Sequence, residues 1–280
     1  MEDILRQLQD RFEIRILPEF TSFLSTRVVR DRKQKKLWIC MDQYLEKLLT
    51  LYELEYHKLS DTPLSTQELV PFDGEATPSQ IKAYQRRIGS IIYPASTVRP
   101  DVAFGASKLA EFMMNPSPSH LAEANRMITY LYKTRYQAIE YSAVTMDNLE
   151  AASDASFADD SMTRRSSQGY LIKLFNGPIA WQASRQKTVT TSTTEAELLA
   201  LSYTGREIQF LARIFKAIRL DIDEDLSIDC DNQQTVRIVT QQAPTISTKL
   251  RHVDIHQFWL RQQVTSGKYQ VKWVPTGEMA

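Results

Sequence analysis

Three acidic residues in this chain stand at positions from which their carboxylates could act together. Asp154 lies in a strand-like segment, Glu197 lies near the start of a long helical segment, and Asp231 follows a second strand-like run, 226–230. Carboxylate oxygens are the ligands that hard divalent cations such as Mg²⁺ take. A pair of such cations roughly 3.5–4 Å apart suits in-line phosphoryl transfer. The three acids therefore predict a divalent-metal site that acts on phosphate esters.

The helical segment that carries Glu197 also carries Glu195, and the two acids have different surroundings. Ser192 followed three residues later by Glu195 is typical of a capping box, which gives Glu195 a role at the helix start. Glu197 instead heads an apolar stripe that continues through Leu201, Ile208, Leu211, Phe215 and Ile218. A carboxylate on that face is expected to be buried, so it needs a cation, a metal or hydrogen-bond donors as its partner.

Each of the three acids also has a purely structural alternative. Asp154 could be a surface residue at a strand end, and Asp231 could cap the helix that begins at Asn232. Glu197 could pair with a buried arginine. The order of the elements favours a shared site, because one acid falls at the first strand, one at the helix start and one at the end of the fourth strand.

The elements that must position these acids follow one another in a regular order. Strand-like runs cover 169–175 and 178–183 before the long helix, which the pattern extends over 193–220. After the fourth strand come a helical stretch, 232–241, and an alternating final strand, 269–274. Strands mixed with helices in this order predict a mixed α/β domain.

The chain upstream of this domain begins with a block that contains strands. Within 1–62, the runs 13–17, 27–31 and 36–41 are strand-like, and the polar residues between the last two predict a hairpin. Asp42 is expected to cap the helix that follows.

A linker and a helical region separate this block from the α/β domain. Residues 63–78 contain prolines and little periodicity, which is typical of a linker. Within 79–143 we expect three helices, with Ser79 and Ser117 as N-caps, over 79–93, 100–114 and 117–134.

Overall charge gives no sign of a nucleic-acid partner, because 34 basic residues balance 34 acidic ones. Residues 79–136 differ, with eight basic residues and three acidic ones, which fits contact with phosphates or an ordinary basic helical surface. Cys40 and Cys230 have no metal-ligand spacing and are expected to be free thiols in a reducing compartment. No apolar run of about 18 residues occurs. We therefore expect an intracellular location, cytoplasm or nucleus, with no membrane partner.

Five segments of the chain carry a shared signal. They are 99–104, 152–160 with 163–170, 192–197, 230–233 and 248–256. Together they resemble the ribonuclease H domain of copia-type LTR retrotransposon polyproteins, in that family's order and spacing, and the match continues upstream of the domain through Arg-Pro-Asp-Val-Ala-Phe. A single motif would be weak evidence, whereas five in register are a strong signal.

The resemblance implies a fold and a division of the chain. The expected fold is α/β, a ribonuclease H-like mixed sheet flanked by helices, preceded by a helical thumb- or connection-like region and a small β/α palm remnant. The implied parts are a reverse transcriptase palm remnant, a linker, the helical region and a ribonuclease H-like domain lacking its C-terminal end, over 1–62, 63–78, 79–143 and 148–280.

The resemblance also implies an activity, which is metal-dependent hydrolysis of RNA in RNA–DNA hybrids. Asp154, Glu197 and Asp231 would hold Mg²⁺ or Mn²⁺ in a two-metal site, and His252 would assist proton transfer or product release. The partner would be an RNA–DNA hybrid or another nucleic-acid duplex, within a larger polyprotein. The residues expected to contact nucleic acid are Arg86, Arg87, Arg164, Arg165, Lys187 and Asn232.

Two features depart from an intact family member. The pair Asp159-Asp160 lacks the Tyr-x-Asp-Asp context of a polymerase, so no polymerase site is expected. The family has a fourth carboxylate shortly after a Val-Pro-Thr turn, whereas here 274–276 is followed by Glu278, which does not match that position. Two hypotheses remain: a nuclease with three carboxylates and a weakened metal site, or a catalytically inactive nucleic-acid-binding remnant of a copia-type element.

Overall fold

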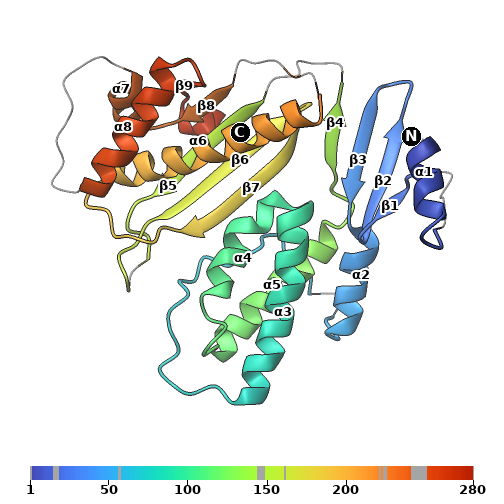
Figure 1. The fold of residues 1–280 in the computed structure, drawn as a ribbon. Helices are drawn as coiled ribbons and strands as arrows, with labels where there is room; N and C mark the ends of the chain where they lie inside the picture. Colours follow the sequence, from blue (N-terminus) through green and yellow to red (C-terminus); the bar gives the residue numbers. More distant parts are fainter. Residues whose placement is uncertain are drawn as a thin grey trace.

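The computed structural model describes residues 2–14, 19–55, 58–143, 149–160, 162–220, 222, 226–240 and 251–279, with the backbone alone for 2–4 and 251–253. Two hydrophobic cores organise these residues, one in the N-terminal half and one beneath the C-terminal sheet. Figure 1 shows the two sheets and the helical region that packs between them.

The C-terminal half is built on a five-stranded mixed sheet with the order β7-β6-β5-β8-β9. The strands β5, β6 and β7 pair antiparallel, and β8 and β9 add to β5 in parallel. This arrangement confirms the expected ribonuclease H-like mixed sheet. The strands are Glu150–Ser156 (β5), Ser167–Leu174 (β6), Gly177–Arg185 (β7), Ser227–Cys230 (β8) and Gln270–Trp273 (β9).

Helices cover this sheet, with α6 lying along it and α7 and α8 beside α6 (Figure 1). Leu201 and Ile208 of α6 are fully buried against the sheet, as the apolar stripe predicts. The prediction that the stripe ends at Ile218 is wrong, because this residue follows the last residue of α6 and is 65% exposed. The helices are Thr193–Ala217 (α6), Gln233–Thr240 (α7) and Arg251–Thr265 (α8), and a 3-10 turn, Thr276–Glu278 (η2), follows β9.

The start of α6 differs in one respect from the predicted capping box. Ser192 is the N-cap, and its hydroxyl accepts a hydrogen bond from the Glu195 amide at 3.2 Å. The carboxylate of Glu195, however, accepts from the amide and the hydroxyl of Thr191 and not from the Ser192 amide. Glu195 therefore stabilises Thr191, the residue before the N-cap, and this structural role argues against a catalytic one.

The N-terminal sheet has the order β1-β2-β3-β4, and its β2–β3 pair is the predicted hairpin. The fourth strand, β4, lies about 100 residues after β3 in the chain. It pairs with β3, with Leu37 opposite Tyr141. Within the run 13–17, Glu13 and Ile14 are not in a strand, and 15–17 lie outside the described residues. The elements are Glu2–Gln9 (α1), Ser22–Phe23 (β1), Thr26–Asp31 (β2), Lys36–Cys40 (β3), Asp42–Leu51 (α2) and Ile139–Ser142 (β4).

The helical region shares its core with α2, since Leu45 and Leu48 pack in the same cluster as Ile88 and Ile128. It contains Pro78–Thr97 (α3), Pro100–Val102 (η1), Ala103–Ala110 (α4) and Pro118–Lys133 (α5).

Two of the three predicted N-caps in this half are wrong. Thr77, not Ser79, caps α3 and forms a full capping box with Gln80. Asp42 is the first residue of α2 and forms an ion pair with Arg27 instead of capping the helix. Ser117 does cap α5, followed by Pro118 at the first helical position. Short polar residues close together near a helix start compete for the cap, so sequence alone places it within a few residues.

Contacts tie the two halves together. The Trp181 indole N–H of β7 donates to the carbonyl of Ala95 at 2.6 Å, and the Tyr141 hydroxyl donates to the carbonyl of Pro178 at 2.7 Å. Cys40 and Cys230 are buried free thiols, as expected. Among the described helices, none combines the length and the apolar character that crossing a membrane requires.

Candidate metal centre

The structure brings Asp154, Glu197 and Asp231 together at one end of the C-terminal sheet. One carboxylate oxygen from each lies within 4.8 Å of the others. Asp154 comes from β5, Glu197 from the first turns of α6, and Asp231 from the residue after β8. The parallel pairing of β5 with β8 makes this possible, because Ser153 and Cys230, the residues just before the two aspartates, are paired.

Glu197 is the most buried of the three, with 5% of its surface exposed. Its Oε1 accepts a hydrogen bond from the Ala155 amide at 3.2 Å, and its Oε2 has no partner among the described residues. Burial, with added repulsion from Asp154 and Asp231, raises the pKa of Glu197 to about 8. The alternative of a buried arginine partner therefore has no support within the described part of the chain.

The two aspartates face the same group of charges. Partial desolvation and the charge of Asp231 raise the pKa of Asp154. Asp231 accepts a hydrogen bond at Oδ2 from the Thr276 hydroxyl at 2.7 Å. Its alternative role as a helix cap is taken by Asn232, whose Oδ1 accepts from the Thr235 amide at 2.9 Å. Asp231 is thus left facing the other two acids.

A cavity of about 520 Å³ opens beside the aspartates. Asp154 is in register with Gly169 and Ala183, and all three line the cavity from one face of the sheet. The opposite wall comes from the helical region, through η1 and the start of α4, including Phe104. The site therefore lies between the sheet and the helical region.

Comparison with known proteins shows which proteins this chain is similar to. No protein-family model matches the chain. The chain is 28% identical over 277 residues to the retrovirus-related Pol polyprotein from transposon TNT 1-94 of Nicotiana tabacum, covering 97% of this chain and 21% of the relative. It is 27% identical over 276 residues to the Pol polyprotein from transposon RE1 of Arabidopsis thaliana, covering 99% and 18%.

The chain is a homologue of the copia-type retrovirus-related Pol polyproteins. It spans about a fifth of the length of the curated relatives that it matches.

Two solved structures are also similar to this Pol-like chain. The foamy viral protease-reverse transcriptase in complex with RNA/DNA hybrid aligns with 91% of this chain and 29% of its own, at 10% identity and a TM-score of 0.46. LC11-RNase H1 in complex with RNA/DNA hybrid aligns with 48% of this chain and 89% of its own, at 12% identity and a TM-score of 0.37. The strand order β7-β6-β5-β8-β9 defines the fold of the C-terminal sheet.

The other site residues predicted for this Pol-like chain are more dispersed. Arg164 and Lys187 are exposed, and Arg165 is half-buried, in the segments that flank β6 and α6. Asn232 is engaged as the cap of α7. The side chain of His252 lies outside the described residues.

Arg86 and Arg87 lie on α3, away from the three acids in the chain fold. Arg86 is exposed, whereas Arg87 donates to Asn125 at 2.8 Å and lies over the Tyr52 ring at 4.5 Å. Arg87 therefore stabilises the helical region, and Arg86 is the one of the two with a free approach to solvent.

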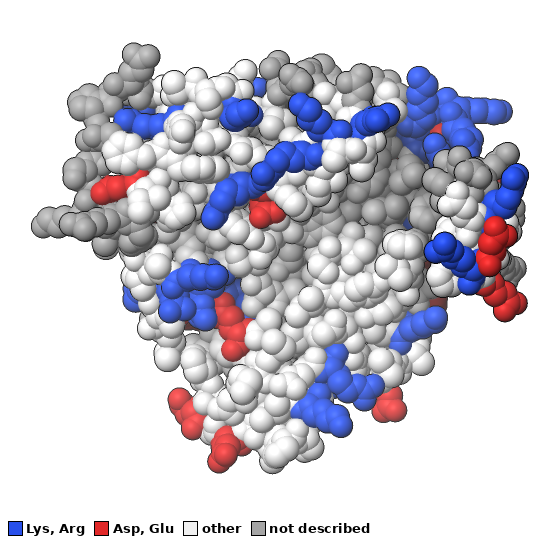
Figure 2. Space-filling model, in the orientation of Figure 1, with Lys and Arg blue, Asp and Glu red and all other residues white. Residues whose placement is uncertain are grey.

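The sequence interpretation missed two kinds of residue at the site. Thr276, which orients Asp231, belongs to the Val-Pro-Thr turn and could have been found from that motif. Phe104 reaches the cavity from another part of the fold, and no local pattern marks it. Figure 2 shows Lys and Arg side chains on the face of the molecule that carries the C-terminal half. On α6, Arg206, Arg213 and Lys216 are exposed, whereas Glu197 is buried.

Proposed function

We propose that this chain is a part of a retrotransposon polyprotein whose C-terminal half, 148–280, is ribonuclease H-like and hydrolyses RNA in RNA–DNA hybrids with a divalent metal, Mg²⁺ or Mn²⁺. Asp154, Glu197 and Asp231 would hold the metal. The observation that carries the proposal is their convergence within 4.8 Å, with one oxygen of the buried Glu197 left without a partner among the described residues.

The three side chains fit a hard divalent cation. Three carboxylates that converge in this way repel one another, and a buried carboxylate without a counter-charge is strongly unfavourable. Oxygen ligands of this kind suit Mg²⁺ and Mn²⁺. A bound metal would supply a nucleophile at neutral pH and stabilise the charge of the phosphodiester as it is cleaved.

The surrounding groups hold the carboxylates in place. The Ala155 amide orients Glu197, and the Thr276 hydroxyl orients Asp231. Carboxylates fixed by such hydrogen bonds lose little conformational freedom when a metal binds. This support favours a preorganised site.

The cavity and its rim suit a nucleic-acid strand. Exposed Arg164 and Lys187 flank the elements that carry the acids, and such side chains can pair with phosphates without reading sequence. Distinction of RNA from DNA would use the 2′-OH groups, which a shallow minor groove presents. A contribution of His252 to proton transfer belongs to the same proposal.

The test is cleavage of a labelled RNA–DNA hybrid by the purified chain, with Mg²⁺ and then Mn²⁺. Glu197→Gln removes a proposed ligand, and Glu195→Gln is its matched control, two residues away on the same helix. We expect cleavage to be lost in Glu197→Gln and kept in Glu195→Gln. Equal cleavage by both variants would contradict the proposed site.

The non-catalytic alternative has one structural observation in its favour. Among the described acids, Glu278 is not part of the converging group, so three carboxylates are present there. Hybrid binding that is salt-sensitive, with no cleavage under either metal, would identify a nucleic-acid-binding remnant in place of a nuclease.

A further inference from the structure

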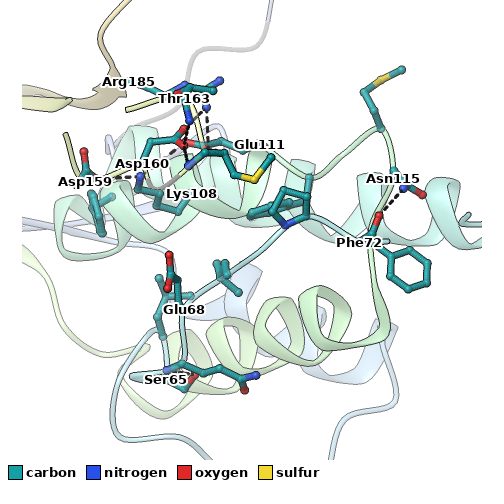
Figure 3. A pocket seen from close by; sticks show the side chains of 18 residues that line it. Ser65, Glu68, Phe72, Lys108, Glu111, Asn115, Asp159, Asp160, Thr163 and Arg185 are labelled. Atoms are coloured by element: carbon teal, nitrogen blue, oxygen red, sulfur yellow. Dashed lines mark hydrogen bonds and ion pairs between the residues drawn. The ribbon is translucent and has the colours of Figure 1, made fainter. Parts of the chain in front are cut away.

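A network of ion pairs joins the helical region to the β5–β6 loop of the ribonuclease H-like sheet (Figure 3). Lys108 of α4 contacts Asp159 at 2.9 Å, and Arg185 at the end of β7 contacts Asp160. Glu111, the residue that follows α4, links the two pairs, at 3.3 Å from Arg185 and 3.9 Å from Lys108. The network thus ties α4 and the residue after it to the β5–β6 loop and to the end of β7.

The two aspartates of this network also shape their own loop. Asp159 accepts hydrogen bonds from the amide and hydroxyl of Ser167, at 2.7 and 2.8 Å. Asp160 accepts from the amides of Met162 and Thr163, at 3.0 and 2.9 Å. Asp159 and Asp160, which lack the sequence surroundings of a polymerase motif, therefore fix the β5–β6 loop, and Asp159 also binds it to α4.

The burial of these groups distinguishes the network from an ordinary surface ion pair. Isolated exposed pairs contribute little, because water screens them and their side chains lose entropy. Here the side chains of Lys108 and Asp159 are each 18% exposed, and that of Asp160 is 9% exposed. Charge pairs that are partly desolvated and share partners hold a geometry more firmly.

The helix that this network holds is also a wall of the cavity beside Asp154. Phe104 lies one turn before Lys108 on α4, and the Lys108 ammonium lies 5.7 Å from the centre of its ring. The Phe104 ring is 49% exposed and borders both this cavity and the pocket in Figure 3. Packing in the core does not explain why an aromatic side chain is exposed at this position, beside a cavity that carboxylates line.

We propose that the Lys108–Asp159 and Arg185–Glu111 pairs, with Asp160 holding Arg185, are a latch that positions α4, and that Phe104 on this helix contacts the sugars and bases of the bound hybrid opposite Asp154. The proposal rests on the proposed function, and it assigns part of the substrate cleft to the helical region. Aromatic rings stack on any base and carry no hydrogen-bonding groups, so Phe104 would add affinity without sequence preference.

Four variants of the full chain test the two roles. Phe104→Ala removes the ring and Phe104→Tyr keeps it. Lys108→Met removes the charge with a similar aliphatic stem, and Lys108→Arg keeps the charge. Each variant is measured for hybrid affinity in EDTA by fluorescence anisotropy, for KM and kcat with Mg²⁺ or Mn²⁺, and for thermal stability.

We expect Phe104→Ala to weaken hybrid binding and raise KM about tenfold, a typical effect of losing one stacking contact, with kcat within about twofold. Lys108→Met should also raise KM, and amide hydrogen exchange should become faster in 157–160 and 162–166. Phe104→Tyr and Lys108→Arg should retain wild-type affinity and KM.

The outcomes separate this inference from the proposed function. Wild-type cleavage that depends on Glu197, with unchanged KM and affinity in Phe104→Ala and Lys108→Met, overturns the inference alone. Hybrid binding that depends on Phe104 and Lys108, with no cleavage under either metal, supports the inference and overturns the catalytic part of the proposed function. Absence of both binding and cleavage in the wild type overturns both.

Discussion

The backbone amide of Ala155 donates a hydrogen bond to Oε1 of Glu197 at 3.2 Å, so the strand that carries Asp154 also orients the helix carboxylate. The second oxygen of Glu197 has no such partner among the described residues. One oxygen of this carboxylate is thus held by the fold, and the carboxylate lies within 4.8 Å of those of the two aspartates. This relationship makes Glu197 the residue whose substitution is most informative.

Replacing Glu197 with Gln is expected to stabilise the metal-free chain in a pH-dependent way. In the folded chain, burial raises the pKa of Glu197 from 4.5 to about 8, and the charges of Asp154 and Asp231 add to this increase. Between these values the unfolded chain releases the proton and the folded chain keeps it, so wild-type stability falls as pH rises. Gln does not titrate, and its advantage should grow to about 2–4 kcal/mol by pH 8.

Urea unfolding in EDTA at pH 5, 6.5 and 8 measures this difference. The Glu195→Gln variant is the control, because Glu195 lies outside the group of three converging acids. An offset of Glu197→Gln that stays constant from pH 5 to pH 8 would show that Glu197 is not held in its neutral form.

Two glycines in helices are expected to respond oppositely to alanine. A Cβ at Gly205 of α6 would meet the hydroxyl oxygen of the buried Tyr269 at 2.6 Å, whereas a Cβ at Gly89 of α3 meets nothing within 4 Å. Gly205→Ala should cost about 1–3 kcal/mol through overpacking. Gly89→Ala should stabilise the chain by up to about 1 kcal/mol, because alanine is the better helix former.

Denaturant midpoints of the two variants give the comparison directly. Stabilisation by both substitutions would mean that Tyr269 moves aside without cost and that α6 is less tightly packed on β9 than the structure indicates.

Asn232 is expected to act on stability and not on the metal. Its side chain caps α7 by accepting from the Thr235 amide, which leaves Asp231 available to the site. Asn232→Ala should lower the free energy of unfolding by about 1 kcal/mol, and Asn232→Ser should recover most of it, since serine also caps helices.

Metal affinity of the same two variants is the second readout. If Asn232→Ala lost metal binding while Asn232→Ser kept it, Asn232 would belong to the centre itself, and the assignment of Asp231 as the free acid would need revision.

Much of the C-terminal half followed from the sequence because its signals are local. The Ser192 cap and the apolar stripe from Glu197 located α6, and alternation located β9. The separation of Glu195 from Glu197 also came from helix geometry, because residues two apart do not share a face. These patterns depend on a few neighbouring residues, so one sequence is enough to detect them.

What the sequence did not reveal depends on distant pairing. The strand β4 has four residues and pairs with β3 across about 100 residues of chain, so nothing local marks it. Thr77 and Ser79 both suit a helix start, and only the actual bonds of Thr77 decide between them. The approach of Phe104 to Asp154 comes from the packing of one half on the other, which no motif encodes.

The most direct test of the shared metal site is calorimetric titration of Mn²⁺ into the full chain, its Glu197→Gln variant and its Glu195→Gln variant at pH 7.5. The three-carboxylate centre predicts that the wild type and Glu195→Gln bind with similar affinity and that Glu197→Gln loses at least about tenfold, since changing even a group that only supports a ligand has an effect of that size. Equal Mn²⁺ affinity in all three proteins would contradict it, and would mean that Asp154, Glu197 and Asp231 lie together without forming a metal centre.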